Sequence, residues 1–291
     1  ELFSQALPIM FSMLFIGVGI FNILYFIGQF GEMATAGYGS ALRVEQVLLL
    51  PVIGLNTAVL SIGGQNFGAK KYNRIRELYS KALLFGSSFM AAAGIILFFG
   101  AEFFVSQFTD NTEAIKHGAI YLKVAALIGP IYPVFFITTA VLSIGGQNFG
   151  AKAYDRIREL YTKALFFGSS FMVVAGIILF FGAEFFVSLF TDNLEAIKHG
   201  AIYLKVAALI GPIYPVFFIT TAVFQALKKP IYSLYVSILR LTAFPFLSLW
   251  YVINMKGGDY EDIFYTIMAT NWAMGIAVLI FIGYFLNNVF K

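Results

Sequence analysis

The sequence predicts an all-α membrane protein, a polytopic bundle of about eight transmembrane helices, from its composition and its long apolar runs. Of its 291 residues, 60% are hydrophobic and 12% are charged, whereas soluble domains carry about 25% charged residues. Hydrophobic stretches recur along the chain, each long enough to cross about 30 Å of hydrocarbon as a helix. These stretches are apolar on every side instead of alternating with period two, which favours helices over the strands of a barrel.

Eight expected spans follow the apolar runs, and the loop charges give their orientation. Lysine and arginine gather in the loops after the second, fourth and sixth spans, whereas aspartate and glutamate gather on the opposite side. An excess of basic residues marks cytoplasmic loops. We therefore expect a multi-pass protein of the inner (plasma) membrane with both termini in the cytoplasm. The expected spans are residues 7–29, 41–62, 82–105, 118–142, 164–187, 200–224, 231–254 and 263–287.

A long internal repeat complicates this simple bundle. Residues 57–138, copy 1, return as residues 139–220, copy 2, and a repeat has to be identified before a fold is assigned. Each copy contains a basic segment, an outgoing helix, an acidic turn and a returning helix. Because a helix pair is duplicated, every later segment keeps its side of the membrane, and we treat residues 1–291 as one transmembrane domain. The copies differ at eight pairs of positions: Lys71/Ala153, Asn73/Asp155, Ser80/Thr162, Leu84/Phe166, Ala91/Val173, Ala92/Val174, Gln107/Leu189 and Thr112/Leu194.

Several classes of function have no support in the sequence. The chain contains no cysteine, which excludes disulfides and thiolate metal sites. His117 and His199 each lie beside a lysine at an expected external surface, so neither a metal site nor a cofactor is predicted. No nucleophile, base and oxyanion set can be recognised, so the chain is not expected to be an enzyme. It begins at Glu1 rather than Met, which indicates a trimmed product.

Four motifs give the chain a resemblance to a known family once one repeat copy is removed. They are residues 31–39 (GEMATAGYG), 43–46 (RVEQ), 64–70 (GQNFGAK) and 224–230 (FQALKKP), each at the expected end or face of its helix. In these motifs the chain resembles the C-terminal lobe of a transporter of the multidrug and toxic compound extrusion (MATE) family. The 64–70 motif lacks the spacing and the Lys-Ser/Thr ending of a phosphate-binding loop, so no nucleic acid or nucleotide partner is expected.

The resemblance implies a function and a set of partners. Such transporters have two six-helix lobes, and they exchange inward Na⁺ or H⁺ for an outgoing organic cation or amphipathic drug across the lipid bilayer. This chain has no counterpart of the N-terminal lobe, so we expect it not to transport alone. Some family members carry carboxylates in the first and fourth helices of the second lobe. Here the spans 7–29, 118–142 and 200–224 contain no aspartate or glutamate, which argues against a cation site of that type.

Polar and ionisable residues inside the spans are the candidates for cation or substrate binding. A charged residue at the membrane centre costs roughly 2.5–3.5 kcal/mol and is a functional hypothesis by default. Glu45 would accept a proton or cation, or else bond to a neighbouring helix while Arg43 reaches outward. Arg240 near the middle of its span needs an acidic partner or a water-filled cavity, and Glu45 is the predicted partner because it is the only clearly intramembrane carboxylate. The candidate residues are Glu45, Arg43, Asn56, Tyr132, Tyr214, Arg240 and Asn271.

Two proline-containing segments predict broken helices near the membrane centre. Residues 129–133 and 211–215 both read GPIYP, and proline removes backbone donors and bends a helix. Transporters build sites at such breaks, which makes Tyr132 and Tyr214 candidates, although a purely structural kink explains them equally well. Hydrogen bonds between helices would also explain Asn56 and Asn271. Small residues at 86–88 and 91–94 predict close helix packing, which we expect to be looser in copy 2 because Val173 and Val174 replace alanines.

Two other functions remain open beside the exporter lobe. The near-identity of the copies is also typical of an inactive, membrane-embedded recombination product. A flippase for lipid-linked precursors in the same superfamily would line its cleft with several basic residues, and only Arg43 and Arg240 are present in the spans.

Overall fold

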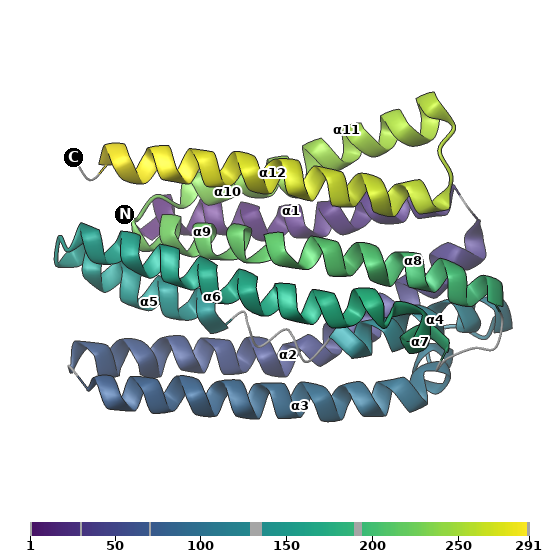
Figure 1. The fold of residues 1–291 in the computed structure, drawn as a ribbon, viewed down its shortest axis with the longest axis horizontal. Coiled ribbons are helices and arrows are strands. Elements are labelled where there is room, and N and C mark those ends of the chain that lie inside the picture. The colour runs from purple at the N-terminus through teal and green to yellow at the C-terminus, as the bar shows by residue number, and fades with distance from the viewer. Residues whose placement is uncertain (1, 30, 70, 129–135, 189–193, 290–291) are drawn as a thin grey trace. The chain divides into compact units, whose positions relative to one another are not determined.

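Helices are the regular elements of the chain in its computed structural model, which describes residues 2–29, 31–69, 71–128, 136–188 and 194–289 (Figure 1). Short turns of different helical geometry interrupt some of them. The helices are α1 (Leu2–Gly28), α2 (Glu32–Gly68), α3 (Tyr72–Ser106), α4 (Thr112–Ile128), α5 (Phe136–Gly150), α6 (Tyr154–Phe181), α7 (Ala183–Ser188), α8 (Leu194–Ile210), α9 (Tyr214–Ala226), α10 (Pro230–Ile238), α11 (Phe244–Trp250) and α12 (Tyr260–Val289), with a 3-10 turn η2 (Gly211–Ile213) and π-helical turns η3 (Leu239–Ala243) and η4 (Tyr251–Met255).

Six helical segments within the described residues are long and apolar enough to cross a membrane. They match six of the eight predicted spans, which confirms an all-α, multi-pass membrane bundle. The other two predicted spans, 41–62 and 118–142, include residues whose placement or side chains are not described, so as membrane spans they stay predictions. Residues 41–62 nevertheless lie within the single helix α2. The six segments are Phe3–Gly28, Asn73–Ser106, Tyr154–Phe181, Gly200–Ala226, Pro230–Met255 and Tyr260–Asn288.

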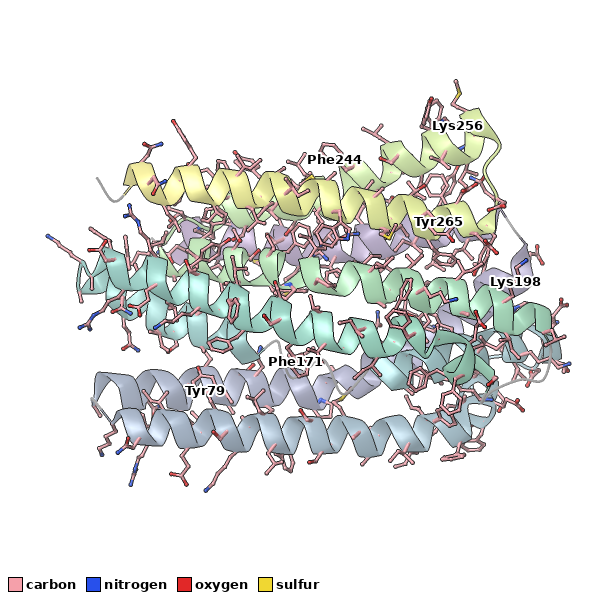
Figure 2. All side chains as sticks on the ribbon, in the orientation of Figure 1. Tyr79, Phe171, Lys198, Phe244, Lys256 and Tyr265 are labelled. Carbon is pink, nitrogen blue, oxygen red and sulfur yellow. The ribbon has the colours of Figure 1, made fainter. Side chains whose placement is uncertain are left out.

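Large apolar side chains cover the outer faces of these helices (Figure 2). Two labelled examples are Phe171 of α6, which is 48% exposed, and Phe244 of α11, which is 46% exposed. Soluble proteins rarely expose apolar surface so continuously. In a bilayer the same surface faces hydrocarbon, so the exposed rings agree with the apolar composition.

The basic turns end their helices by a shared hydrogen-bond pattern. After α5, the amide of Ala153 donates to the Asn148 carbonyl at 2.8 Å and that of Lys152 to the Phe149 carbonyl at 3.0 Å. After α9, Lys229 and Lys228 donate in the same way to Phe224 and Gln225. This is the Schellman ending, which needs a left-handed residue, and Lys152 and Lys228 both have a φ of 57°. These two lysines accept a conformation that usually favours glycine, and they hold positive charge at the helix ends.

The chain forms two compact units, each with its own core. The first unit contains Glu1–Asn22, Ile137–Phe180 and Lys205–Lys291. Its core lies along α9, where Phe217, Ile219 and Phe224 are almost completely buried. Helix α6 packs closely against this core, because a Cβ added at Gly168 of α6 would lie 3.1 Å from Pro215 Cβ of α9.

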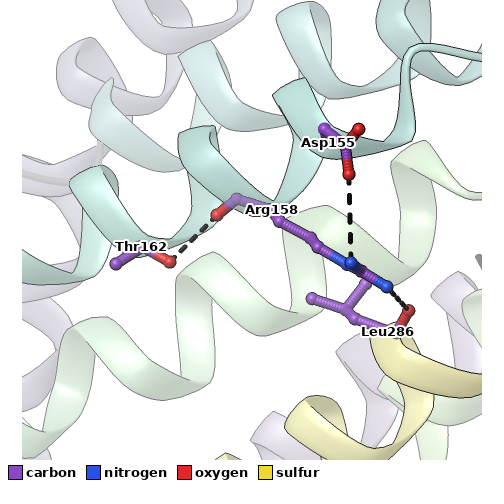
Figure 3. A network of polar contacts seen from close by, with 4 residues as sticks. All are labelled: Asp155, Arg158, Thr162 and Leu286. Atoms are coloured by element: carbon purple, nitrogen blue, oxygen red, sulfur yellow. Dashed lines mark hydrogen bonds and ion pairs between the residues drawn. The ribbon is translucent and has the colours of Figure 1, made fainter.

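A polar cluster joins α6 to the end of α12 within the first unit (Figure 3). Arg158 Nη2 donates to the Leu286 carbonyl at 3.0 Å, and Asp155 lies 3.9 Å from Nη1 of the same guanidinium. Thr162 donates its hydroxyl to the Arg158 carbonyl one turn back. The carbonyls of a last helical turn have no intrahelical partner, so Arg158 satisfies one that α12 leaves open.

The second unit contains Ile23–Phe136 and Phe181–Leu204. Its core is an apolar cluster of α2, α3 and α4, and Tyr38 of α2 meets Tyr121 of α4 edge to face at a centroid distance of 5.0 Å. A Cβ on Gly94 of α3 would lie only 2.7 Å from the Ala126 carbonyl oxygen of α4. The small-residue surface predicted on α3 therefore does bring two backbones together. The clustered residues are Val44, Leu97, Ala101, Val105, Ala119, Leu122 and Ala126.

The prediction of looser packing in copy 2 is wrong. The equivalent glycine, Gly176, approaches the Ala208 carbonyl as closely, with a Cβ distance of 2.8 Å. Val173 and Val174 do not hinder this contact because they are 43% and 59% exposed and lie on the outer face of α6.

Candidate binding site around Arg240

Arg240 lies in a π-helical turn in the middle of the membrane-spanning segment Pro230–Met255. The amide of Phe244 donates to the Leu239 carbonyl, five residues back, which defines the wider turn η3. Pro245 follows this turn and has no amide to donate to the Leu241 carbonyl, so a regular helix would leave that carbonyl open. Single π turns are uncommon and occur frequently at functional sites.

The guanidinium of Arg240 is held by one amide and a set of aromatic rings. Arg240 Nε donates to Asn271 Oδ1 of α12 at 3.2 Å. Asn271 is 7% exposed, and its own Nδ2 donates to the Ile267 carbonyl at 2.8 Å, which fixes its orientation. The Arg240 Cζ atom lies 3.9 Å from the ring centroid of Phe217, 4.9 Å from that of Tyr214 and 5.6 Å from that of Phe218, all on α9.

These contacts explain how the bundle tolerates a charge. A membrane-embedded arginine costs roughly 2.5–3.5 kcal/mol on insertion scales. A desolvated cation over an aromatic face recovers about 2 kcal/mol, and a hydrogen bond to a charged donor recovers about 1.5–3 kcal/mol. The ring contacts and the Asn271 bond together therefore offset the insertion cost without a carboxylate.

The helix break predicted at residues 211–215 forms one wall of this region. The 3-10 turn η2 separates α8 from α9 there, and Trp272 Nε1 of α12 donates to the Leu209 carbonyl at 3.0 Å. Gly275, one turn further along α12, leaves room for the Ile213 side chain, which any added Cβ would overlap. The break thus holds Tyr214 beside Arg240 and is itself fixed by α12.

Helix α1 closes another side of the same turn. A Cβ on Gly19 would lie 2.8 Å from the Leu241 carbonyl oxygen, and Asn22 Nδ2 lies 3.5 Å from the Thr242 carbonyl oxygen. Asn22, Trp272 and Phe217 were not predicted from the sequence. A polar residue within an expected span was the available signal for Asn22, whereas neither ring stands out from the many aromatic residues of this chain.

The structure brings together three of the predicted site residues, namely Tyr214, Arg240 and Asn271. Arg43 and Asn56 lie in the second unit on α2, where Arg43 is exposed and its Cζ is 5.9 Å from the Phe108 ring centroid. Tyr132 and the side chain of Glu45 lie outside the described residues. The Glu45–Arg240 contact therefore stays a prediction. Within the described ranges, no group of three or more histidine, aspartate or glutamate side chains could hold a metal ion.

Comparison with known proteins agrees with the motif-based resemblance. The family model described as MatE matches residues 8–143 and again residues 131–248, so each match contains one repeat copy. The probable multidrug resistance protein YpnP of Bacillus subtilis is 24% identical over 48% of this chain and 32% of its own length. The FAD transporter of Shewanella oneidensis is 27% identical over 41% of this chain and 26% of its own length. The chain thus spans about a third or less of these relatives.

A solved structure extends the comparison to the fold. It is a MOP superfamily transporter from Pyrococcus furiosus, which aligns over 99% of this chain and 96% of its own with a TM-score of 0.57. Sequence identity in that alignment is 11%, so the likeness concerns the fold alone.

Proposed function

The chain belongs to the MatE family, and on that premise we propose that it is the second lobe of a cation-coupled multidrug efflux antiporter. In this proposal it works in the inner membrane, with both termini in the cytoplasm, and faces a first lobe across the substrate pathway. Na⁺ or H⁺ moves inward while an amphipathic drug moves outward. The matched relatives are longer, and their full activity would need both lobes.

The observation that carries this proposal is the polar site inside an apolar bundle. Arg240, Asn271 and Tyr214 meet where α8 and α9 are separated by η2 and where α10 and α11 are separated by η3. Both interruptions lie inside membrane-spanning segments. Interrupted helices expose backbone groups for substrate and provide points about which helix halves rotate. A static structural bundle has no need for either feature at the same place.

The coupling cation would need a carboxylate outside this polar site. The acidic residues of the first unit within its described part lie in the first two turns of α6, in the first turn of α12 or in the turn before α12, away from Arg240 in sequence. Glu45 of α2 is therefore the proposed cation acceptor within this chain, and the partner lobe would supply any other. Arg43 and Asn56 of α2 are proposed to line the pathway beside it.

Two alternatives are tested by the same experiment. An inactive recombination product would fold but never export, and a flippase would act on lipid-linked precursors without protecting against drugs. The name of the Shewanella relative points to a third cargo, a dinucleotide, for the same fold. Only the drug-exporter lobe predicts that resistance appears when a first lobe is added.

A drug-resistance assay in an efflux-deficient bacterial host tests the proposal. We expect no protection from the 291-residue chain alone, and protection when it is co-expressed with the N-terminal lobe of a MatE exporter. An unrelated membrane protein of similar size serves as the co-expression control. Protection by the chain alone would contradict the lobe assignment. Failure of the co-expressed pair at matched membrane levels, with an intact exporter active in the same host, would contradict the efflux function.

A further inference from the structure

We propose that Arg240 and the rings of α9 form a binding subsite for an anionic group carried by an aromatic substrate. The substrate class is an aromatic carboxylate, sulfonate or phosphate, and the shared chemistry is an oxyanion next to a flat apolar ring system. This inference rests on the proposed function, because it names what the same site of the exporter lobe recognises.

Arg240 has no anionic partner among the described residues. No carboxylate lies within 4.0 Å of the Arg240 guanidinium among the described residues. Acidic side chains elsewhere in the first unit are engaged near helix ends: Glu159 pairs with Lys163, and Asp155 lies beside Arg158. Among the described side chains, the positive charge of Arg240 is therefore contacted by neutral groups. An anionic ligand would supply the missing counter-charge in a medium where such an interaction is strong.

The guanidinium of Arg240 keeps hydrogen-bond donors beyond those that its neighbours use. Asn271 accepts from Nε, and the side chain of Tyr214 is a further hydrogen-bonding partner, whereas the two terminal nitrogens carry four N–H donors between them. These donors form a planar fork that matches both oxygens of a carboxylate, sulfonate or phosphate. The hydrogen bond to Asn271 fixes the Nε end of the guanidinium, so binding of an oxyanion costs less side-chain entropy than it would for an unrestrained arginine. A cationic substrate would instead meet a fixed charge of its own sign.

An aromatic surface of α9 lies beside the guanidinium of Arg240. Tyr214, Phe217 and Phe218 lie within 6 Å of the Arg240 Cζ atom, so a ligand bound there would lie next to aromatic faces. Phe217 is buried and supports the guanidinium, whereas Phe218 is 36% exposed and Tyr214 is half-buried. Leu239, next to Arg240 in η3, is 41% exposed. Arg240 itself is half-buried, so the subsite is not fully enclosed within the core of the first unit.

Two dyes with the same ring system and opposite charge test the proposal. Fluorescein is an anionic xanthene and rhodamine 6G a cationic one. We would measure the fluorescence anisotropy of each dye with the purified 291-residue chain in phosphatidylcholine nanodiscs. Fluorescein should bind about tenfold more tightly or better, as a charge-assisted hydrogen bond predicts. Equal or tighter binding of rhodamine 6G would overturn the proposal.

Variants of Arg240 then locate the site. Arg240→Gln should lose about tenfold or more of the fluorescein affinity and leave rhodamine 6G unchanged or tighter. Arg240→Lys keeps the positive charge but lacks the planar guanidinium. Its affinity for fluorescein should therefore lie between that of Arg240→Gln and that of the parent chain. Arg158→Gln, an arginine of the same unit outside the subsite, should bind fluorescein as the parent does. Unaltered fluorescein binding by Arg240→Gln would overturn the assignment, and the lysine variant keeps the test valid if the glutamine variant misfolds.

Lipid and drug as sources of the oxyanion are separated by a second arm. If the natural occupant is a lipid phosphate, nanodiscs containing phosphatidylglycerol should weaken fluorescein binding to the parent chain but leave the residual binding of Arg240→Gln unchanged. If it is a soluble substrate, the added lipid should have little effect. Either result supports an oxyanion subsite. If the co-expressed chain gives drug resistance but binds rhodamine 6G more tightly than fluorescein, the oxyanion subsite is contradicted and the efflux function is not. If fluorescein binds more tightly but no resistance appears, the efflux function is contradicted and the subsite is not.

Discussion

The two copies of the repeat have almost the same sequence and yet are divided differently between the units. Copy 1 belongs almost wholly to the second unit, whereas residues 139–180 and 205–220 of copy 2 belong to the first and residues 181–204 to the second. Helices α3 and α4 of copy 1 pack with α2 in the second unit, whereas α9, which begins in copy 2, packs with α6, α10 and α12 in the first. Only copy 2 contributes described residues to the Arg240 site. The difference teaches that these residues encode a helix pair, while the neighbouring helices decide what that pair does.

Contacts within a copy are repeated faithfully. A Cβ on Gly94 would meet the Ala126 carbonyl oxygen at 2.7 Å, and one on Gly176 would meet that of Ala208 at 2.8 Å. The surface ion pair Glu77–Lys81 at 2.6 Å also has its counterpart at 2.5 Å in copy 2. Such contacts depend only on residues that both copies contain.

Tyr79 and Tyr161 show where the copies diverge. Tyr161 is buried, and its hydroxyl forms a hydrogen bond of 2.9 Å with Thr220 Oγ1, which is fully buried. The hydroxyl of Tyr79 is also buried but has no hydrogen-bond partner among the described residues. A buried, unsatisfied hydroxyl is unfavourable. Among the described residues, copy 1 therefore lacks a counterpart of the hydrogen bond that Thr220 forms in copy 2.

The substitutions between the copies fall outside the packed faces. No substituted position within the described residues is buried in either copy: in copy 1 seven are exposed and Ala91 is half-buried, and in copy 2 six are exposed and Ala153 is half-buried. The eighth position of copy 2, Leu189, lies outside the described residues. The two helix pairs thus present the same packing faces and differ where they would meet lipid or water.

The largest expected effect comes from filling the shared glycine contact. Gly176→Ala and Gly94→Ala should each destabilise their own unit by about 1–3 kcal/mol, because the new methyl group meets a backbone oxygen. Both tryptophans, Trp250 and Trp272, belong to the first unit, so their fluorescence reports that unit alone. In denaturant titrations in detergent, the loss of stability caused by Gly176→Ala should appear both in tryptophan fluorescence and in circular dichroism. The loss of stability caused by Gly94→Ala should appear in circular dichroism only.

Two other glycines provide matched controls for this pair. A Cβ on Gly17 in the first unit or on Gly54 in the second would meet nothing within 4 Å. Alanine there should be neutral or should stabilise by up to about 1 kcal/mol, the usual helix preference. If Gly94→Ala shifts the tryptophan transition as far as Gly176→Ala does, the two units do not unfold separately and the comparison breaks down.

Smaller changes in stability are expected at Tyr161 and Tyr79, and the two changes should differ from each other. Tyr161→Phe should cost about 1 kcal/mol, because it removes a buried hydrogen bond and leaves Thr220 unsatisfied. Tyr79→Phe should be neutral or slightly stabilising, since its hydroxyl lacks a described partner. The same denaturant titrations measure both.

A double variant makes the tyrosine comparison sharper. Replacing both hydrogen-bonding partners by apolar groups of similar shape is close to neutral, so Tyr161→Phe combined with Thr220→Val should recover most of the loss. A cost for Tyr79→Phe equal to that of Tyr161→Phe would mean that copy 1 has a comparable partner for its hydroxyl, and the proposed difference between the copies would be wrong.

Much of the fold could be predicted from the sequence because membrane helices follow from local composition. Six expected spans coincide with apolar helices, and the GPIYP motif at residues 211–215 correctly predicted a broken helix. Tyr214, Arg240 and Asn271 were also identified individually, since each is a polar or ionisable residue in an expected span. The rule that such residues are costly in lipid needs no tertiary information.

The arrangement of the site could not be predicted in the same way. Arg240 and Asn271 meet through the packing of α12 against η3, and no sequence pattern encodes that register. Elimination among the intramembrane carboxylates proposed Glu45 as the partner, and that contact stays a prediction. The contacts of the guanidinium with one amide and three rings were not predicted. The different division of two nearly identical copies between the units likewise cannot be predicted from local sequence, because both copies carry the same packing faces.

Disulfide trapping tests most directly whether η2 of copy 2 packs against α12. The chain has no cysteine, so engineered pairs react without background. Gly275 and Ile213 are in direct contact, whereas a Cβ on Gly17 of the same unit would meet nothing within 4 Å. A disulfide needs the two Cβ atoms about 3.5–4.5 Å apart. In oxidised native membranes, Gly275→Cys with Ile213→Cys should therefore form an intramolecular disulfide in most chains, detected by mass spectrometry, whereas Gly17→Cys with Ile213→Cys should form little. Equal or preferential trapping of the Gly17 pair would contradict the account.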